Sequence, residues 1–339
     1  MHCRHAPIMA LTTEEVLGWS RVGVLLLGMG WAAWMDHKER RVSNNHWLVW
    51  VKPAIFIWCL ELLAREADWT IYLTASAVIA YASVAIIGRP TIKDVLSGNR
   101  LDILVSVWYL ASFIGVIVGM SKYSDVSLLD VLLGESTGMA ALYWTTLSGL
   151  VVIFVIDFGW RLRLIHGGAD AKALMWVAIL IPNWSTMPLI YDYGSEVALQ
   201  LPPAISLLMW GGLSFLLIPF FLMGKNIIQG HVTSAGDLRM FWHSTVMSLD
   251  NVQTSHVWLL TSIIEMPNGE FKPYNKTRAP RRTPTEEKLA QQIEELRSNG
   301  IDEVWVSYKL PLLVFLFPVI LPMALLGDIT AIILSIAGL

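Results

Sequence analysis

The sequence predicts an all-α protein, a polytopic membrane helix bundle of about eight transmembrane segments with a small cytosolic α+β insertion. Two observations lead to this fold class. Of the 339 residues, 55% are hydrophobic and only 15% are charged, whereas soluble domains carry about a quarter charged residues. Apolar runs of about 20 residues, the length that crosses a bilayer core, also recur along the chain. Sixteen tryptophans agree with this class, because indole rings favour the membrane–water interface.

The apolar runs set the expected transmembrane segments. They span 16–35, 47–64, 69–88, 101–120, 139–160, 171–190, 204–224 and 310–338. Charged residues follow the first run instead of preceding it, so we expect a retained helix and not a cleaved signal peptide. The last run contains Pro318, Pro322, Gly327 and Asp328, which predicts a kink or a re-entrant hairpin.

Charge in the short loops orients these segments. If the N-terminus lies outside, the cytosolic loops hold eight basic residues and the outside loops hold two, as the positive-inside rule requires. The eight are Lys38, Arg40, Arg41, Arg89, Lys93, Arg100, Arg161 and Arg163, and the two are Arg65 and Lys122. This parity places the end of the first segment and the start of the sixth at the same face, the cytosolic one. The predicted location is the plasma membrane.

One long polar segment divides the chain into three parts. We expect a membrane domain at 1–224, a cytosolic α+β module at 225–309 and a C-terminal membrane segment at 310–339. In the module, 255–264 and 304–306 have the composition of strands. A helix begins at Thr283-Pro-Thr-Glu286 with a threonine as its cap. Its apolar stripe is Leu289, Ile293 and Leu296, and Asn299-Gly300 ends it.

Several function classes find no support. The net charge of −3 gives no basis for a nucleic-acid partner. The two cysteines, Cys3 and Cys59, form no CxxC pair or zinc pattern. No HExxH motif is present, and His231, His243 and His256 are too scattered for a metal site. We therefore predict no cofactor and no metal.

The stretch from Arg161 to Leu174 is a polar break between two apolar runs. Two glycines, Gly167 and Gly168, precede Ala169 and then Asp170 at the start of the next helix. Glycines permit close backbone approach and positive φ, which would let an extended substrate pass beside the carboxylate. The alternative is a tight turn with Asp170 as a helix cap.

A second aspartate, Asp36, closes the first apolar run at the same predicted face. By itself it is an ordinary member of a juxtamembrane charge cluster. Together with Asp170 it can form a pair that shares one proton, because two close carboxylates do not both ionise readily. Such a pair can activate water against a peptide bond without a metal. The helix ends favour Asp170 as the anion and Asp36 as the acid, whereas Lys38 and Arg40 act the other way on Asp36.

These residues carry a family resemblance. The segment from Asp36 to Asn44, Asp-His-Lys-Glu-Arg-Arg-Val-Ser-Asn, resembles the Asp-x-Lys-x-Arg-x-Ile/Val-Pro-Asn signature of prepilin peptidases. Gly167-Gly-Ala-Asp170 resembles their second motif, Gly-x-Gly-Asp. The two patches, with 304–311 before the final run, are similar to the archaeal preflagellin/prepilin peptidases, the class III signal peptidases. Ser43 stands where the family has proline, and Ala169 replaces a motif glycine.

The resemblance implies an aspartic membrane endopeptidase of the GxGD type. It would cleave the short leader of type IV pilin-like or archaellin precursors at the cytosolic face, with Asp36 and Asp170 as the catalytic pair. Gly167, Gly168 and Ala169 would position the backbone. Four further residues are candidates for lining the site: Lys38, Arg40, His166 and Lys172. The implied partners are the precursor proteins and the lipid bilayer.

Other polar residues receive simpler interpretations. Asp157 lies four residues before Arg161, which predicts an i,i+4 ion pair. Glu61 and Asp328 lie near helix ends or breaks, and we expect them to face water. The alternative function is a proton- or cation-coupled transporter that uses the interfacial aspartates, although such sites usually lie at the bilayer midplane beside inverted repeats. A third possibility is a structural membrane protein with an inactive motif.

Overall fold

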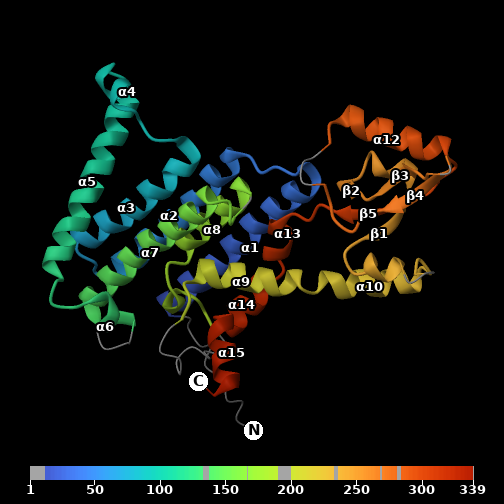
Figure 1. The fold of residues 1–339 in the computed structure, drawn as a ribbon. Coiled ribbons are helices and arrows are strands. Elements are labelled where there is room, and N and C mark those ends of the chain that lie inside the picture. The colour runs from blue at the N-terminus through green and yellow to red at the C-terminus, as the bar shows by residue number, and fades with distance from the viewer. Residues whose placement is uncertain are drawn as a thin grey trace, which may run out of the picture. The chain divides into compact units, whose positions relative to one another are not determined.

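The computed structural model describes residues 12–132, 137–165, 167–189, 200–232, 236–267, 269–280 and 284–338. The chain forms two compact units, one made of 1–211 with 311–339 and the other of 212–310. The division therefore falls within the seventh apolar run, thirteen residues before the expected boundary at 224. Figure 1 shows the elements of both units.

Helices make up the first unit. Their bounds are α1 Thr13–Glu39, α2 Asn44–Ala64, α3 Trp69–Ile87, α4 Ile92–Leu96, α5 Arg100–Lys122, α6 Leu128–Leu132, α7 Gly138–Arg161, α8 Gly168–Leu180, the 3-10 turn η1 Trp184–Thr186, and α9 Pro203–Phe215, whose last four residues belong to the second unit. Three short C-terminal helices follow, α13 Leu312–Leu316, α14 Ile320–Leu326 and α15 Ile329–Ala337. In the described residues, six stretches are long and apolar enough to cross a membrane, and a bent pair raises the total to seven.

The expected count of eight spans was therefore too high, and α8 is the reason. The run at 171–190 was predicted as a full span, but α8 has only 13 residues and ends at Leu180. Ile181 precedes Pro182, and the residue before a proline is driven out of the helical region. Ile181 accordingly lies outside the helical region, with φ −128° and ψ 80°. The sequence is apolar enough for a span, but the backbone leaves the helix halfway.

The final apolar run is broken as its composition predicted. A bend of 54° separates the stretch Leu312–Leu326 from α15. Gly327 takes a positive φ of 80° at the break, a conformation that glycine adopts without strain. Asp328 then caps α15 by accepting a hydrogen bond from the backbone N–H of Thr330.

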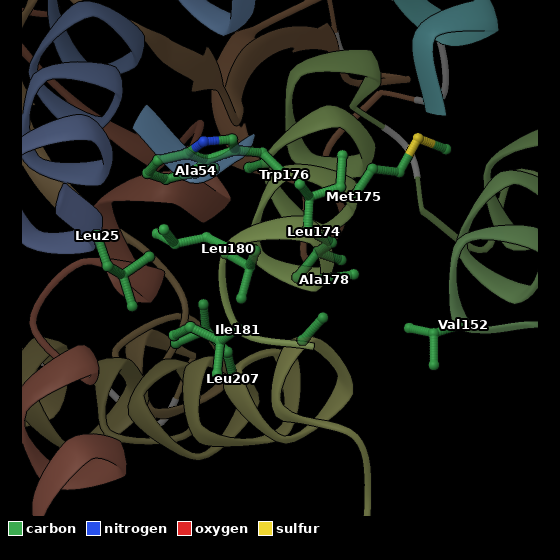
Figure 2. Close-up of a cluster of buried hydrophobic side chains, with 14 of the residues drawn as sticks. Leu25, Ala54, Val152, Leu174, Met175, Trp176, Ala178, Leu180, Ile181 and Leu207 are labelled. Atoms are coloured by element: carbon green, nitrogen blue, oxygen red, sulfur yellow. The ribbon is translucent and has the colours of Figure 1, made fainter. Parts of the chain in front are cut away.

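The core of the first unit is built around α8. Every residue of α8 from Ala173 to Leu180 is buried, whereas the long helices keep an exposed face. Helices α1, α2, α3, α7 and α13 all contact α8. Figure 2 shows side chains of α8 together with Leu25 of α1, Ala54 of α2 and Val152 of α7, which belong to the same buried cluster. A helix that is apolar on all sides belongs in the interior of a bundle, and α8 lies there.

The second unit is a small α+β module joined to the helix α10, Ile218–Ile228. Its strands are β1 Thr245–Ser248, β2 Val257–Leu259, β3 Thr261–Glu265, β4 Phe271–Asn275 and β5 Glu303–Tyr308, with the 3-10 turn η3 Asp237–Arg239 and the helices α11 Leu249–Val252 and α12 Glu286–Ser298. One antiparallel sheet has the order β1-β5-β2, and β3 pairs with β4. The register places Val246 opposite Trp305 and Ile263 opposite Pro273.

The module agrees with the predicted pattern and corrects its details. The apolar stripe of α12 packs against the sheet through Ile293 and Leu296, and the helix ends at Asn299 with Gly300 at a φ of 69°. Its cap is Thr285, whose side chain accepts from Lys288 N–H; Thr283 lies outside the described residues. The strand predicted at 255–264 is two strands, β2 and β3, and β1 and β4 were not predicted.

Candidate active site

Asp36 is held in the last turn of α1. It is only 8% exposed, and α1 ends three residues later. Arg40 closes the helix in the left-handed conformation, with φ 55°, and its N–H donates to the carbonyl of Asp36 at 3.1 Å. The charge of Arg40 also acts on the Asp36 carboxylate, as does the backbone N–H of Leu313 at the start of α13. One cation and one amide donor therefore act on the Asp36 carboxylate.

The Arg40 side chain is half-buried, and one of its N–H donors is unpaired in the described structure. Its Nε–H is buried and has no hydrogen-bond acceptor within the described part of the chain. A buried donor without a partner is costly, so the fold leaves an unsatisfied polar group on Arg40, close to Asp36.

Asp170 occupies the third position of α8, behind a glycine cap. Gly167 is the N-cap residue and supplies no side-chain hydrogen bond. The Asp170 carboxylate turns back and accepts from the backbone N–H of Gly167. This contact is one half of a capping box, the half that the third residue makes with the cap backbone. The alternative interpretation of Asp170 as the N-cap residue is therefore wrong in position, although the carboxylate does serve the helix start.

A glycine is needed at position 167 because the Asp170 carboxylate lies close to it, and not because the backbone there has a positive φ. A Cβ atom built on Gly167 would overlap the carboxylate of Asp170. Its φ of −91° is open to any residue, and Gly168 does not have a positive φ either. At Gly168 a Cβ would meet the ring of Trp160 at 3.1 Å. Gly167 thus leaves room for the carboxylate itself.

The structure brings Asp36 and Asp170 together. The charge of Asp36 acts directly on the Asp170 carboxylate, and α1 contacts α8 while α13 contacts both. The two aspartates are 134 residues apart in the chain and arrive from the end of one helix and the start of another. Each has one backbone amide donor, and Arg40 is the cation beside Asp36. Two carboxylates in a half-buried site, with one cation near them, can hold a proton between them.

A second contact joins the two motif segments on the other side of α8. Lys172 donates from Nζ to the Asn44 side-chain oxygen at 2.8 Å, and Asn44 donates in turn to the carbonyl of Ile86 at 3.2 Å. Asn44 is the first residue of α2, where Ser43 acts as cap and accepts from His46 N–H. Ser43 thus performs a capping role at the position where the resembling family has proline.

The other residues that the sequence suggested for this site lie in different surroundings. Ala169 is half-buried and packs against the core. Lys38 is exposed, and its Nζ lies 5.1 Å from the ring of Trp34, so it does not line the aspartate pair. His166 lies outside the described residues. Lys172 faces Asn44, away from the carboxylates, and only Arg40 of the four candidate lining residues is placed beside an aspartate.

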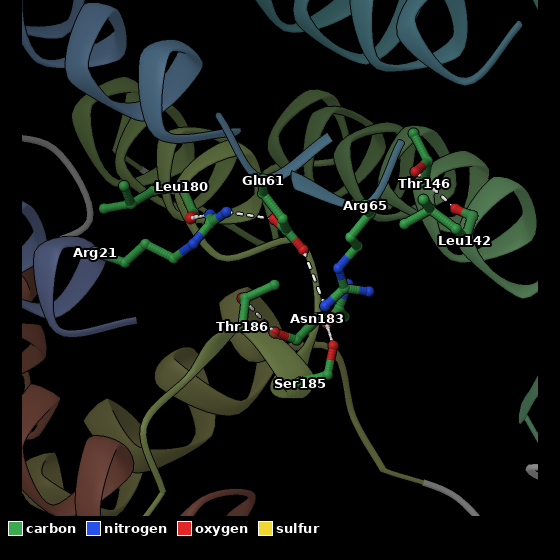
Figure 3. Close-up of polar contacts among 9 residues, drawn as sticks. All are labelled: Arg21, Glu61, Arg65, Leu142, Thr146, Leu180, Asn183, Ser185 and Thr186. Carbon is green, nitrogen blue, oxygen red and sulfur yellow. Dashed lines mark hydrogen bonds and ion pairs between the residues drawn. The ribbon is translucent and has the colours of Figure 1, made fainter. Parts of the chain in front are cut away.

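Sequence reasoning missed a buried ionic network at the opposite end of α8. Arg21 of α1 is 1% exposed, and it donates to the carbonyl of Leu180 and to the Glu61 carboxylate. Arg65 approaches the other oxygen of Glu61 at 3.3 Å. Figure 3 shows the three charged side chains in one line beside the end of α8. An arginine inside an apolar run was the available signal, because such residues are rare in membrane segments.

The expectation that Glu61 and Asp328 face water is wrong, because the two residues are only 6% and 3% exposed. Asp328 accepts from the backbone N–H of Leu201 at 2.9 Å and from the hydroxyl of Ser206 at 2.8 Å, so it joins the last helix to the start of α9. The predicted Asp157–Arg161 pair is confirmed at 2.8 Å, and Tyr81 also donates to Asp157 at 3.0 Å.

Neither metal ligation nor a known relative adds to this site. Within the described residues, no cluster of three or more His, Cys, Asp or Glu side chains is arranged to hold a metal ion. No protein-family model, curated protein or solved structure matches the chain.

Proposed function

We propose that the chain is a membrane-embedded aspartic endopeptidase of the prepilin peptidase type. The observation that carries this proposal is that Asp36, which is buried, and Asp170, which is half-buried, lie close enough for their charges to interact. Close carboxylates oppose each other's ionisation, so a fold gains no stability from placing them together. Paired carboxylates with one shared proton are suited to general acid–base chemistry on an amide.

The contacts assign a role to each aspartate. Asp36 has the cation of Arg40 beside it and the N–H of Leu313, so it is the anion and takes the proton from the attacking water. Asp170 has only the N–H of Gly167, so it holds the proton and donates it to the scissile carbonyl oxygen. When the C–N bond breaks, Asp36 passes the proton that it took from water to the leaving amine, and Asp170 recovers a proton from the hydroxyl of the tetrahedral intermediate. This assignment reverses the one that the helix ends alone favoured, because Arg40 and Leu313 outweigh the helix-end effect at Asp36.

The proposed substrate is a type IV pilin-like or archaellin precursor. A charged leader followed by an apolar helix would keep the leader in the cytosol and the helix in the bilayer, with the scissile bond at the interface between them. The loop charges support a position of both aspartates at the cytosolic face of the plasma membrane. The motif segments 36–44 and 167–170 support this substrate class through their resemblance to the preflagellin/prepilin peptidases.

A transporter remains the second candidate because the bundle contains two features common in transporters. Helix α8 is a half-length helix inside the bundle, and the Arg21–Glu61 pair lies buried between apolar helices. Discontinuous helices and buried ionisable residues mark transport pathways. Against this, every charge on Arg21 and Glu61 faces a partner, whereas an ion site needs ligands that are free to bind.

The test is cleavage of a precursor. Proteoliposomes that contain the full chain are incubated with a pilin-like or archaellin precursor, and leader release is followed by mass spectrometry. We expect cleavage by the wild type and a loss of at least about 1,000-fold in Asp36→Asn and in Asp170→Asn, as for loss of a catalytic acid or base. Asp157→Asn is the matched control, because Asp157 is a buried helix-end aspartate that pairs with Arg161. Cleavage that survives both substitutions would refute the proposal.

A further inference from the structure

An apolar groove lies on the side of α8 that the aspartates do not use. It is bounded by α2, α3, α5 and α8 and encloses about 230 Å³. Its walls are almost entirely apolar: Trp47, Leu48, Val51, Ile55, Ile79, Ala82, Ile86, Ile87, Trp108, Met175, Trp176 and Ile179, with Ser83 as the one hydroxyl. Helices α2, α3 and α5 are apolar enough to cross a membrane, so the groove runs along the hydrocarbon-facing part of the bundle.

One end of the groove carries a positive charge. Lys172 is the only charged residue that lines it. Its ammonium donates to the neutral side chain of Asn44, and no carboxylate pairs with it among the residues that the structure describes. The ammonium also lies 5.8 Å from the centre of the Trp160 ring, so its described partners are a neutral amide and an aromatic face, and its charge has no counter-anion among them. The Lys172–Asn44–Ile86 hydrogen bonds close this end across three helices.

A second donor without a partner lines the same groove. Trp47 is fully buried, and its indole N–H has no hydrogen-bond acceptor in the described structure. By contrast, the indole N–H of Trp176, on the facing wall, donates to the carbonyl of Trp50 at 2.9 Å, and that of Trp108 donates to Ser76 at 2.7 Å. Of the three tryptophans that line the groove, Trp47 is therefore the one whose indole N–H is unpaired in the described structure, whereas the cation of Lys172 is the group that the groove offers to an anion.

The occupant is separate from a substrate at the aspartates. Lys172, Met175, Trp176 and Ile179 form one stripe of α8 at helical spacing. Asp170 precedes Lys172 by two residues, which places it about 200° around the helix at 3.6 residues per turn. A peptide bond at Asp36 and Asp170 therefore lies across α8 from this groove.

We infer that the groove binds an anionic phospholipid from the bilayer. One acyl chain lies between α2, α3 and α8, and the phosphate accepts from Lys172 at the end of the groove. The chemistry of the groove matches this ligand from end to end, since an apolar chain meets apolar walls and an anion meets the single cation. Basic pockets between membrane helices bind anionic headgroups for the same reason. Arg89, exposed two residues after Ile87, adds positive charge at the end of α3.

Native mass spectrometry of the full chain released from nanodiscs tests this inference. The nanodiscs contain equal amounts of phosphatidylglycerol and phosphatidylcholine. We expect one phospholipid to stay bound to the wild type, with phosphatidylglycerol enriched. Lys172→Gln keeps the hydrogen bond to Asn44 but removes the charge, so the enrichment should fall about tenfold, as for one charge-assisted hydrogen bond. Val51→Trp fills the groove and should remove the bound lipid altogether.

Two matched variants control for charge and bulk. Lys52→Gln removes an exposed lysine of α2 that does not line the groove, and Val151→Trp adds the same indole to an exposed position of α7. Both should retain lipid as the wild type does. The inference is overturned if the wild type retains no phospholipid, if Lys172→Gln leaves the enrichment unchanged, or if the mass released by Val51→Trp is a second copy of the chain.

Discussion

Both ends of α8 hold buried ionisable side chains, but one end pairs a base with an acid and the other pairs two acids. At its C-terminal end, Arg21 and Glu61 bring opposite charges together, and Arg21 also satisfies the last carbonyl of the helix. At its N-terminal end, Asp36 and Asp170 bring together two acids that oppose each other's ionisation. The first arrangement completes the hydrogen bonds of a helix that stops inside the bundle. The second opposes folding, and arrangements of that kind are kept where chemistry requires them.

Removing one carboxylate from each end of α8 is expected to give the largest difference between the two ends. Glu61→Gln leaves the Arg21 guanidinium buried without its counter-charge, and we expect a loss of about 3–5 kcal/mol in the free energy of unfolding. Asp170→Asn removes a carboxylate from a like-charged pair and should leave stability unchanged or raise it. Chemical unfolding of the purified chain in detergent measures both. Equal destabilisation by the two substitutions would remove the distinction between the two ends.

The next effect in size concerns the space beside Asp170. Gly167→Ala places a methyl group where the carboxylate lies, so Asp170 must turn away from the N–H of Gly167. Misplacing a catalytic group by about 1 Å costs on the order of 100-fold in rate, and precursor cleavage should fall by that amount. Gly159→Ala is the control, because its Cβ meets only Ile165 at an ordinary distance of 3.7 Å. Full cleavage by Gly167→Ala would mean that the position of this carboxylate does not matter.

The smallest expected effect lies at the exposed edge of the Glu61 network. The Arg65 side chain is 31% exposed and approaches Glu61 at 3.3 Å. Partly exposed ion pairs contribute little after screening by solvent, so Arg65→Gln should cost at most about 0.5 kcal/mol of unfolding free energy. The same unfolding assay measures it beside Glu61→Gln. A loss as large as that of Glu61→Gln would show that Arg65, and not Arg21, is the main partner of the carboxylate.

The sequence was sufficient for the class of fold and for most of its helices. Six of the expected runs became helices of membrane-crossing length, because hydropathy over about 20 residues reports burial in lipid directly. The same measure failed at α8, since hydropathy does not register that Pro182 stops the helix at Leu180. It also concealed Arg21, whose charge is masked by the apolar residues on either side. A window average is insensitive to a single residue that ends a helix or carries a buried charge.

The sequence brought the two aspartates of the candidate site together but did not predict their contacts. Charge parity and motif spacing singled out Asp36, Asp170 and the glycines, because helix count and loop charge restrict which ends can meet. They did not show that Gly167 makes room for the carboxylate, since that depends on how Asp170 turns back on the helix cap. The groove beside Lys172 was invisible for a related reason. Its walls come from residues 47 to 179 of four helices, and their packing creates it.

A double-mutant cycle on unfolding tests the central claim, that Asp36 and Asp170 act on each other as a like-charged pair. Asp36→Asn, Asp170→Asn and the double variant are unfolded chemically in the same detergent at pH 7.5. If the two carboxylates oppose each other's ionisation, the native pair carries the cost either of repulsion or of holding one proton, and each single substitution removes that same cost. The double variant should therefore gain less stability than the sum of the two single variants. A difference of about 1 kcal/mol is expected for charges in a half-buried site. Strictly additive effects would show that the two aspartates do not interact, and would contradict the account.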